Sequence, residues 1–283
     1  MKVYVQMDFE GIAGLVQWDD YATDSPMNAA RRTRMRHLLT AEVNAAVEGA
    51  FAAGATQVLI WDSHGPSNNC DNLYVEELHP EAEIIIGTKG LPGPCALLDA
   101  SFHAGIHVGA HAMRGTEHAI TPHNLTVING QPYGEVGTFI LVCGWFNVPM
   151  VFISGDKAGV AEATKLVPNV ETVVTKEAFG PYSAKTRTPQ KARQLIREGV
   201  ERALKRRDEI VPVKLTAPFR FEDTATEGTD FMETYTRHIE ARGHHYGVQD
   251  LEPELSRFNE KRARWRRFRS FIVPETEKRD AVR

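Results

Sequence analysis

Cysteine is scarce in this chain of 283 residues. Only Cys70, Cys95 and Cys143 occur, and they are far apart, odd in number and not in any C-x-x-C pair. This spacing argues against a disulfide framework and against a zinc knuckle built on cysteines. A reducing cytoplasm is therefore the expected compartment.

Long apolar runs and a strong charge of one sign are also lacking. No run approaches the roughly 18 apolar residues of a membrane span, and the opening MKVYVQMDFEG alternates like a strand and lacks signal-peptide features. A net charge of −4 gives no reason to expect nucleic acid or membrane as a partner. The basic run KRARWRRFR at 261–269 is more typical of a solvated or subunit-facing helix than of a nucleic-acid site.

Short buried strands alternate with helices over most of the chain. This alternation predicts an α/β fold with a largely parallel sheet and helices on both faces. Strands are expected at 3–7, 56–61, 82–86, 104–108, 150–153 and 170–175, a hairpin around Asn129-Gly130, and helices at 27–53, 135–146 and 189–207.

The pattern changes beyond residue 210. A last strand signal covers 211–215, and the following sequence is strongly charged with interleaved aromatics. We therefore expect an α/β core at 1–210 and a smaller C-terminal lobe or oligomerisation arm at 211–283.

Residues able to bind metal follow the ends of several predicted strands. In open α/β sheets, ligands bind beyond the carboxyl ends of the strands. The candidates are Asp8 and Glu10 after the first strand, His64 after the second, His111 after the fourth, His123 in the next loop, and Glu135 at the start of a helix.

Each candidate also has an ordinary structural interpretation. Asp8 and Glu10 stand at i and i+2, so both carboxylates can face one cation, but a strand-end Asp also forms turns and helix caps. His64 lies in Asp-Ser-His, which could be a polar turn. For His64 the metal interpretation places one ring nitrogen on the ion and the other on an orienting group.

The later candidates leave similar alternatives open. His111 could be a core histidine bonded to a carbonyl, and His107, four residues earlier, is the neighbour most easily mistaken for it. Glu135 could be a first-turn glutamate favoured by the helix dipole. His123 suits acid/base work or oxyanion stabilisation, although an exposed surface histidine would look the same.

Taken together, carboxylates and imidazoles without thiolates suit zinc, and less well manganese or cobalt. Two ions need a bridging group, which Asp8 can provide with one oxygen to each. They would polarise a carbonyl and lower the pKa of a bridging water to about 7, so that a metal-bridged hydroxide acts as nucleophile. Asp62 and Asp156 could support the ligands from behind.

Several motifs in order along residues 1–175 resemble the zinc D-aminopeptidases of the DppA type, peptidase family M55. They are DFEGIAG at 8–14, DSH at 62–64, GAHA at 109–112, Gly115-Thr116, His123, Asn129-Gly130 and GEVG at 134–137. The resemblance implies a cytoplasmic enzyme that cleaves short D-amino-acid peptides. It also implies a ring-shaped homo-oligomer, of which a decamer is one form, with enclosed active sites.

The resemblance further implies a role for each site residue. Asp8 would bridge two zinc ions, Glu10 and His111 would complete one ion's ligands, and His64 and Glu135 the other's. His123 falls on the position of the proposed catalytic histidine.

Two departures from the family pattern stand out. Ala110 replaces a common aromatic, which would enlarge or reshape the pocket. From about residue 219 onward, including His244-His245-Tyr246, the chain does not look like the usual family ending.

Other functions compete with the D-peptidase hypothesis. The same metal site could cleave another small amide or a lactam, because specificity depends on pocket shape. A phosphoryl hydrolase is less well supported, since the chain shows neither a Gly-rich phosphate cradle nor a D-x-D motif. A non-catalytic binding protein would be favoured only if metal ligands were lost.

Overall fold

The computed structural model describes residues 1–16, 26–64, 72–87, 95–180, 182–215 and 221–222. Its main feature is a seven-stranded sheet of order β3-β2-β1-β4-β7-β8-β9. The strands are β1 (Lys2–Met7), β2 (Gln57–Asp62), β3 (Ala82–Ile85), β4 (Ala104–Ala110), β7 (Met150–Asp156), β8 (Glu171–Gly180) and β9 (Ser183–Thr186). All neighbours are parallel except the antiparallel pair β8 and β9. The predicted α/β class with a largely parallel sheet is confirmed.

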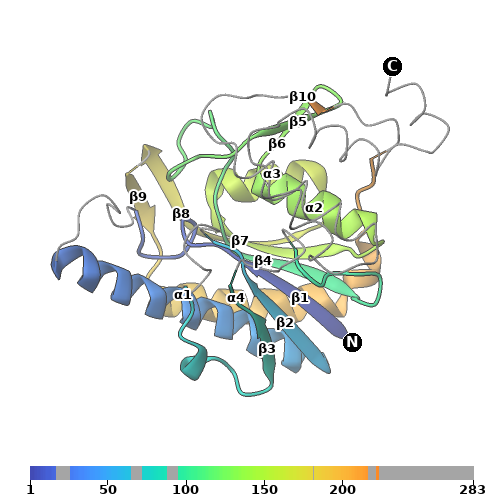
Figure 1. Ribbon diagram of the computed structural model, residues 1–283, viewed down its shortest axis with the longest axis horizontal. Coiled ribbons are helices and arrows are strands. Elements are labelled where there is room, and N and C mark those ends of the chain that lie inside the picture. The colour runs from blue at the N-terminus through green and yellow to red at the C-terminus, as the bar shows by residue number, and fades with distance from the viewer. Residues whose placement is uncertain (17–25, 65–71, 88–94, 181, 216–220, 223–283) are drawn as a thin grey trace, which may run out of the picture.

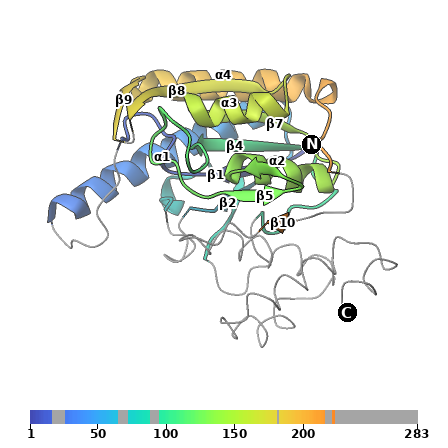
Figure 2. The same cartoon turned by 90° about the horizontal axis from the view of Figure 1, so that it is seen from above.

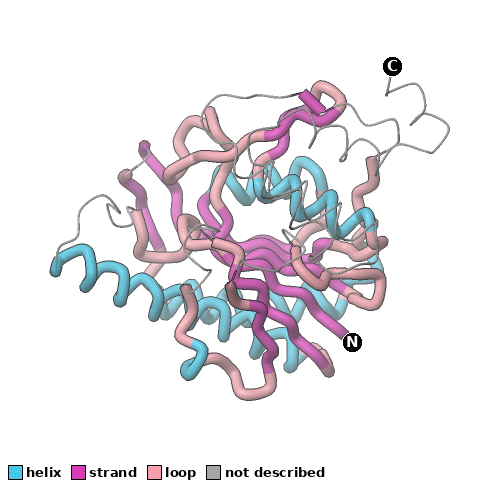
Figure 3. The backbone as a smooth tube through the Cα atoms, viewed as in Figure 1, coloured by secondary structure: helices cyan, strands magenta, loops and turns pink. Residues whose placement is uncertain are grey.

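Helices cover both faces of this sheet, as predicted. They are α1 (Pro26–Ala52), α2 (Glu135–Trp145), α3 (Lys157–Leu166) and α4 (Pro189–Lys205), with 3-10 turns at Val75–Glu77 and Arg207–Glu209. Helices α1 and α4 pack together on one face, and α2 and α3 on the other (Figures 1 and 3). The connection from β1 to β2 contains α1 and moves one way along the sheet, whereas the connection from β4 to β7 contains α2 and moves the other way. Because such connections are right-handed, α1 and α2 lie on opposite faces.

The hydrophobic core lies on both sides of the central strands. Every residue of β4 and β7 is buried, which explains why these strands read as continuous apolar runs. Tyr4 of β1 packs edge-on against Phe102, with ring centroids 5.3 Å apart, and its hydroxyl donates to the carbonyl of Ala96. No helix within the described ranges combines the length and apolar character needed to cross a membrane.

A small antiparallel sheet of order β10-β5-β6 lies beside α2 and α3 (Figure 1). Its strands are β5 (Thr126–Ile128), β6 (Gln131–Tyr133) and β10 (Phe221–Glu222). Asn129 and Gly130 both have positive φ angles, 52° and 73°, as a two-residue hairpin turn requires. The predicted hairpin is confirmed, and β10 adds a third strand from beyond residue 210.

Some local predictions were incomplete or wrong. Helix α3 was not predicted, because its sequence KAGVAEATKL is short and buries only three residues. The segment 211–215, predicted as a strand, has no regular structure; Pro212 lacks the N–H that a sheet ladder needs. Most of the predicted C-terminal lobe at 211–283, and all of the basic run at 261–269, lie outside the described residues, so the boundary at 210 stays a prediction.

The order of the strands determines where a site can form. The chain runs outward from β1 through β2 to β3, then returns to add β4, β7 and β8 on the other side of β1. The direction reverses between β1 and β4, and ligands of open α/β sheets bind at such a point, beyond the carboxyl ends of the strands. Figure 2 shows the same strands from a second direction.

Candidate metal centre

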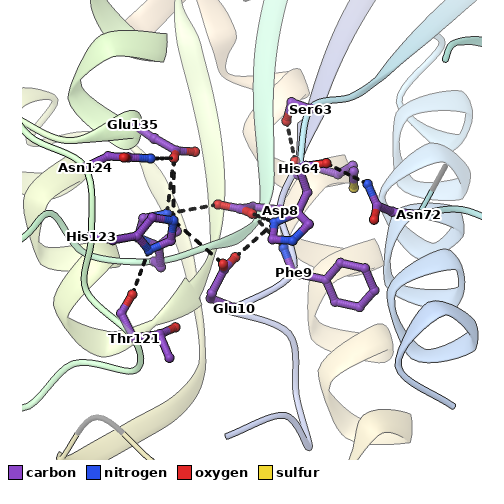
Figure 4. Close-up of polar contacts among 12 residues, drawn as sticks. Asp8, Phe9, Glu10, Ser63, His64, Asn72, Thr121, His123, Asn124 and Glu135 are labelled. Atoms are coloured by element: carbon purple, nitrogen blue, oxygen red, sulfur yellow. Dashed lines mark hydrogen bonds and ion pairs between the residues drawn. The ribbon is translucent and has the colours of Figure 1, made fainter. Parts of the chain in front are cut away.

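The six predicted site residues meet beyond the carboxyl ends of β1 and β4, where the strand order reverses. Asp8 and Glu10 lie between His64 on one side and His123 and Glu135 on the other (Figure 4). Their ligand atoms fall into two sets, and within each set all the ligand atoms lie within 4.8 Å of one another. We call Asp8, Glu10 and His64 the closed group, and His111, His123 and Glu135 the open group.

The closed group is held by the ends of β1 and β2. The Nδ1 atom of His64 lies 2.8 Å from Asp8 Oδ1 and 3.4 Å from Glu10 Oε2. The turn that carries His64 is fixed by Asn72, whose side-chain amide donates to the carbonyl of His64 and to Asp62. Asp62 therefore supports the turn through Asn72, as its position behind the ligands suggested.

Asp8 connects the two groups. Its Oδ1 faces His64, whereas its Oδ2 lies 3.3 Å from His111 Nε2. This contact depends on a close approach of β1 and β4, in which Asp8 N donates to Val108 O and Gly11 N donates to Gly109 O, both at 2.8 Å. A Cβ on Gly109, whose φ is +77°, would lie 2.0 Å from Asp8 O, so only glycine fits there.

The open group contains the most accessible candidate residue. The rings of His111 and His123 stack with centroids 4.0 Å apart. His123 Nε2 lies 3.8 Å from Glu10 Oε1 and 3.9 Å from Glu135 Oε1, and the His123 side chain is 37% exposed. His111 Nε2 lies 3.5 Å from Glu135 Oε1.

Backbone carbonyls orient both stacked imidazoles. His111 Nδ1 lies 2.8 Å from Ala112 O, and His123 Nδ1 lies 2.7 Å from Thr121 O. A carbonyl can only accept, so both Nδ1 atoms donate and each Nε2 faces the cluster. Thr121 and Asn124, on either side of His123, have φ angles of 40° and 54°. Asn tolerates a positive φ, but for the β-branched Thr121 this conformation is strained, and such strain clusters at functional sites.

The charges of the cluster are interdependent. Burial alone would raise the pKa of Glu10, but His64 and His111 reverse this effect and hold that pKa below its usual range. Burial alone would lower the pKa of His64, but Glu10 and Asp8 raise it to about 10. Burial likewise opposes a charged His111, yet Asp8 and Glu135 raise its pKa well above the usual value. In the metal-free protein, the protonated imidazoles of His64 and His111 therefore offset part of the negative charge of the neighbouring carboxylates.

Several of these buried atoms fit a metal centre. Within the described part of the chain, Asp8 Oδ2, both carboxylate oxygens of Glu10 and His111 Nε2 have no hydrogen-bond partner. Buried polar atoms are normally paired, and an unpaired set with this chemistry is explained by cations that bind there. The residues present therefore fit a metal centre of carboxylate and imidazole ligands.

The structure separates other histidines and acids from the cluster. His107 lies in the core, where burial lowers its pKa to about 4, and a register shift between His107 and Ala110 separates it from His111. Asp156 caps α3 and accepts from Ile120 N at 2.9 Å, so it supports the loop before His123. Ala110, which was expected to reshape the pocket, is wholly buried in the core.

Besides Asn72, two further supporting residues were missed by the sequence analysis. Asn124 donates from its side chain to Glu135 Oε1. Lys176 of β8 is buried and donates from Nζ to the carbonyls of Glu10 and Leu15. Burial lowers the pKa of Lys176 to about 8, so the ammonium form predominates at neutral pH. The sequence offered one signal for Lys176, which is its place directly after the strand predicted at 170–175, where the carboxyl ends of the other strands were also expected to lie.

The fold and the cluster together indicate a metal-dependent enzyme built on an α/β fold. The model of the D-aminopeptidase family, peptidase family M55, matches residues 1–241, and the chain belongs to this family. The predicted family and the predicted class of enzyme, a metallo-aminopeptidase, are thereby confirmed.

Two relatives from Bacillus subtilis support this membership. A D-aminopeptidase of strain 168 is 36% identical over 226 residues, which cover 78% of this chain and 79% of the relative. The solved structure of the zinc-dependent D-aminopeptidase DppA, described as a self-compartmentalizing protease, is 33% identical with a TM-score of 0.71, over 78% of this chain and 80% of that one.

The family match corrects one prediction about the C-terminal region. It continues to residue 241, so the departure predicted from about residue 219 begins later. His244-His245-Tyr246 lie beyond both the match and the described residues.

Proposed function

We propose that this protein is a zinc-dependent D-aminopeptidase with two metal ions, acting on short peptides that begin with a D-amino acid. The observation that carries the proposal is that three carboxylates, with Asp8 at the centre, meet three imidazoles in a largely buried cluster. The names of the two relatives supply zinc and the D-peptide substrate.

Asp8 is proposed as the bridge between the ions. Its two oxygens face different histidines, as expected of a carboxylate shared by two cations. The resemblance paired Glu10 with His111 and His64 with Glu135, whereas the distances place Glu10 beside His64 and Glu135 beside His111. We therefore propose that Glu10 and His64 would bind one ion and His111 and Glu135 the other, with Asp8 common to both and His123 outside both sets of ligands.

When bound, zinc would polarise a carbonyl oxygen and make water acidic enough to act as a nucleophile near neutral pH. His123 is proposed as the catalytic residue that meets the substrate, since its Nε2 faces the cluster and its side chain is the most exposed of the six. Its hydrogen bond to Thr121 O leaves Nε2 available to take or give a proton during peptide cleavage. Asn124 and Thr121 hold this loop in place.

A homo-oligomer is proposed as the working form, because the solved relative is described as self-compartmentalizing. Light scattering coupled to size-exclusion chromatography measures the mass in solution. A ring, such as a decamer, would give a mass several times that of one chain, and a monomer at working concentration would contradict the proposal.

Metal analysis combined with a substrate panel tests the activity itself. Elemental analysis of purified protein should find zinc, and the enzyme should cleave D-aminoacyl amides and D-dipeptides faster than their L-isomers. Removal of zinc by a chelator should abolish cleavage, and added zinc should restore it. Preferential cleavage of L-peptides or lactams would retain the site but overturn the proposed substrate.

A further inference from the structure

Lys176 stands out among the charged residues of the molecule. It is 1% exposed, and among the described residues it is the only buried lysine or arginine. A buried ammonium is costly unless it is paired and hydrogen-bonded, so its partners indicate what it does. Those partners belong to the loop that carries two of the candidate ligands.

The backbone of the loop after β1, residues 8–15, is held by three side chains from other elements. Lys176 Nζ donates to the carbonyl of Glu10 and, at 2.6 Å, to the carbonyl of Leu15. Its neighbour Thr175 donates to the carbonyl of Gly11. From α1, Glu42 accepts a hydrogen bond from Ala13 N at 2.8 Å. A single ammonium therefore joins the two ends of the turn that carries Glu10.

The Glu10 carboxylate contacts other candidate ligands, with Oε2 3.4 Å from His64 Nδ1 and Oε1 3.8 Å from His123 Nε2. It is fully buried, and neither carboxylate oxygen has a hydrogen-bond partner within the described residues. His64 has Asn72 behind it, and Glu135 has Asn124, whereas no side chain from outside the cluster holds the Glu10 carboxylate in the described part of the chain. The backbone of Glu10, whose carbonyl is held by Lys176, therefore helps to set the direction of this side chain.

We propose that Lys176 is a positioning residue for the metal centre, which fixes the backbone of Glu10 so that the Glu10 carboxylate is presented to the metal. This inference rests on the proposed function, since it requires a metal at the closed group. Glu42, itself buried, is the acid that most favours the charged form of Lys176. Loss of the ammonium should weaken metal binding while the sheet stays folded.

The experiment measures zinc affinity by competition with a chromophoric chelator in the wild type and three variants. Lys176→Met removes the ammonium and keeps the length of the side chain. The double variant Lys176→Met with Glu42→Gln also removes the charge that would be left unpaired, and the Gln oxygen can still accept from Ala13 N. Tyr4→Phe is the matched control, because it removes a buried donor to a backbone carbonyl away from the loop.

Both Lys176 variants should bind zinc about 10- to 100-fold more weakly, the usual effect of losing a group behind a metal ligand. Tyr4→Phe should bind zinc like the wild type, and circular dichroism should show that all variants are folded. A folded double variant with wild-type zinc affinity would overturn the proposal. A double variant that cannot fold would assign Lys176 to the fold as a whole and overturn it too. A wild type that binds no zinc would refute the proposed function and this inference together, and it is recognised before any variant is made.

Discussion

The closed and open groups contain similar ligands but differ in exposure and in how they are held. The side chains of Asp8, Glu10 and His64 are at most 4% exposed, and they follow directly from β1 and β2. In the open group His111 is buried, but Glu135 is 19% and His123 37% exposed. The open group depends on a loop with several positive φ angles and on the start of α2.

This difference indicates a division of labour within one site. Groups on strand ends are fixed by the sheet ladder, which suits tight binding of a cation, whereas a loop residue with an exposed edge can meet a substrate. We expect the closed group to control metal retention and the open group to control turnover. The predictions below test this division.

The largest effect is expected for Asp8→Ala, because this residue belongs to both halves of the site. The variant should lose zinc from both groups, and kcat/KM should fall at least about a thousandfold, as several kcal/mol of transition-state stabilisation disappear. Zinc content and cleavage of a D-aminoacyl amide are measured side by side. Asp208→Ala, at a carboxylate that is 85% exposed, is the control and should match the wild type. Retention of zinc and turnover in Asp8→Ala would refute the site.

His123→Ala separates the two groups most directly. The variant should keep its zinc but lose about 100- to 10,000-fold in kcat, the usual contribution of a general acid or base. His118→Asn is the control on the same loop, since Asn tolerates the positive φ of that position. If His123→Ala instead lost zinc, His123 would be a ligand beside His111 and Glu135, and the proposed division would be wrong.

The positions of these groups could largely be predicted from sequence. Parallel strands bring their carboxyl ends to one edge, so Asp8, His64 and His111 had to lie near one another once their strands were recognised. The hairpin was predictable from Asn129-Gly130, because few other residue pairs accept two positive φ angles.

What sequence could not supply depends on tertiary contacts. The contact of Asp8 with His111 depends on the close approach of β1 and β4 at Gly109, which no local pattern specifies. A lysine in a strand is ordinarily expected to be solvated. Only the tertiary fold brings the Lys176 ammonium, from β8, to the carbonyl of Glu10. Helix α3 depends on Asp156 as its cap and on packing against β7 and β8 more than on a strong apolar face.

The pH dependence of zinc binding tests the charges in both groups. The pKa of His64 is raised to about 10 and that of His111 is raised well above its usual value, so both imidazoles are protonated at neutral pH without metal. Zinc must displace these protons, and its affinity should therefore rise by about tenfold per pH unit for each proton released. Activity should correspondingly fall as the pH drops towards about 5.

Calorimetry in two buffers of different ionisation enthalpy measures this proton release. Roughly one to two protons should leave per protein at neutral pH. A comparison with His64→Ala assigns the closed group's share, provided that the variant still binds an ion. Zinc binding without net proton release would show that the imidazoles of His64 and His111 are neutral in the metal-free protein. The neighbouring carboxylates would then not raise the pKa of these histidines as expected.

The smallest effect is expected behind the open group, at Glu162. Its Oε1 accepts a hydrogen bond from Met113 N at 2.7 Å, two residues after His111, and burial raises its pKa from 4.5 to about 7. An acid whose pKa is raised by folding stabilises the protein while neutral. Its contribution is therefore present below about pH 4.5 and is lost as the pH rises through about 7.

Glu162→Gln keeps the acceptor for Met113 N and removes the titration. At pH 8 the metal-free variant should exceed the wild type in free energy of unfolding by about 1–3 kcal/mol, and the two should converge near pH 4.5. Thermal unfolding at both pH values measures the difference, with the exposed Glu76→Gln as the control. Equal stability at pH 8 would mean that Glu162 is ionised at no cost. The segment after His111 would then be solvated, like the exposed edge of His123, and the open group would differ from the buried closed group still more.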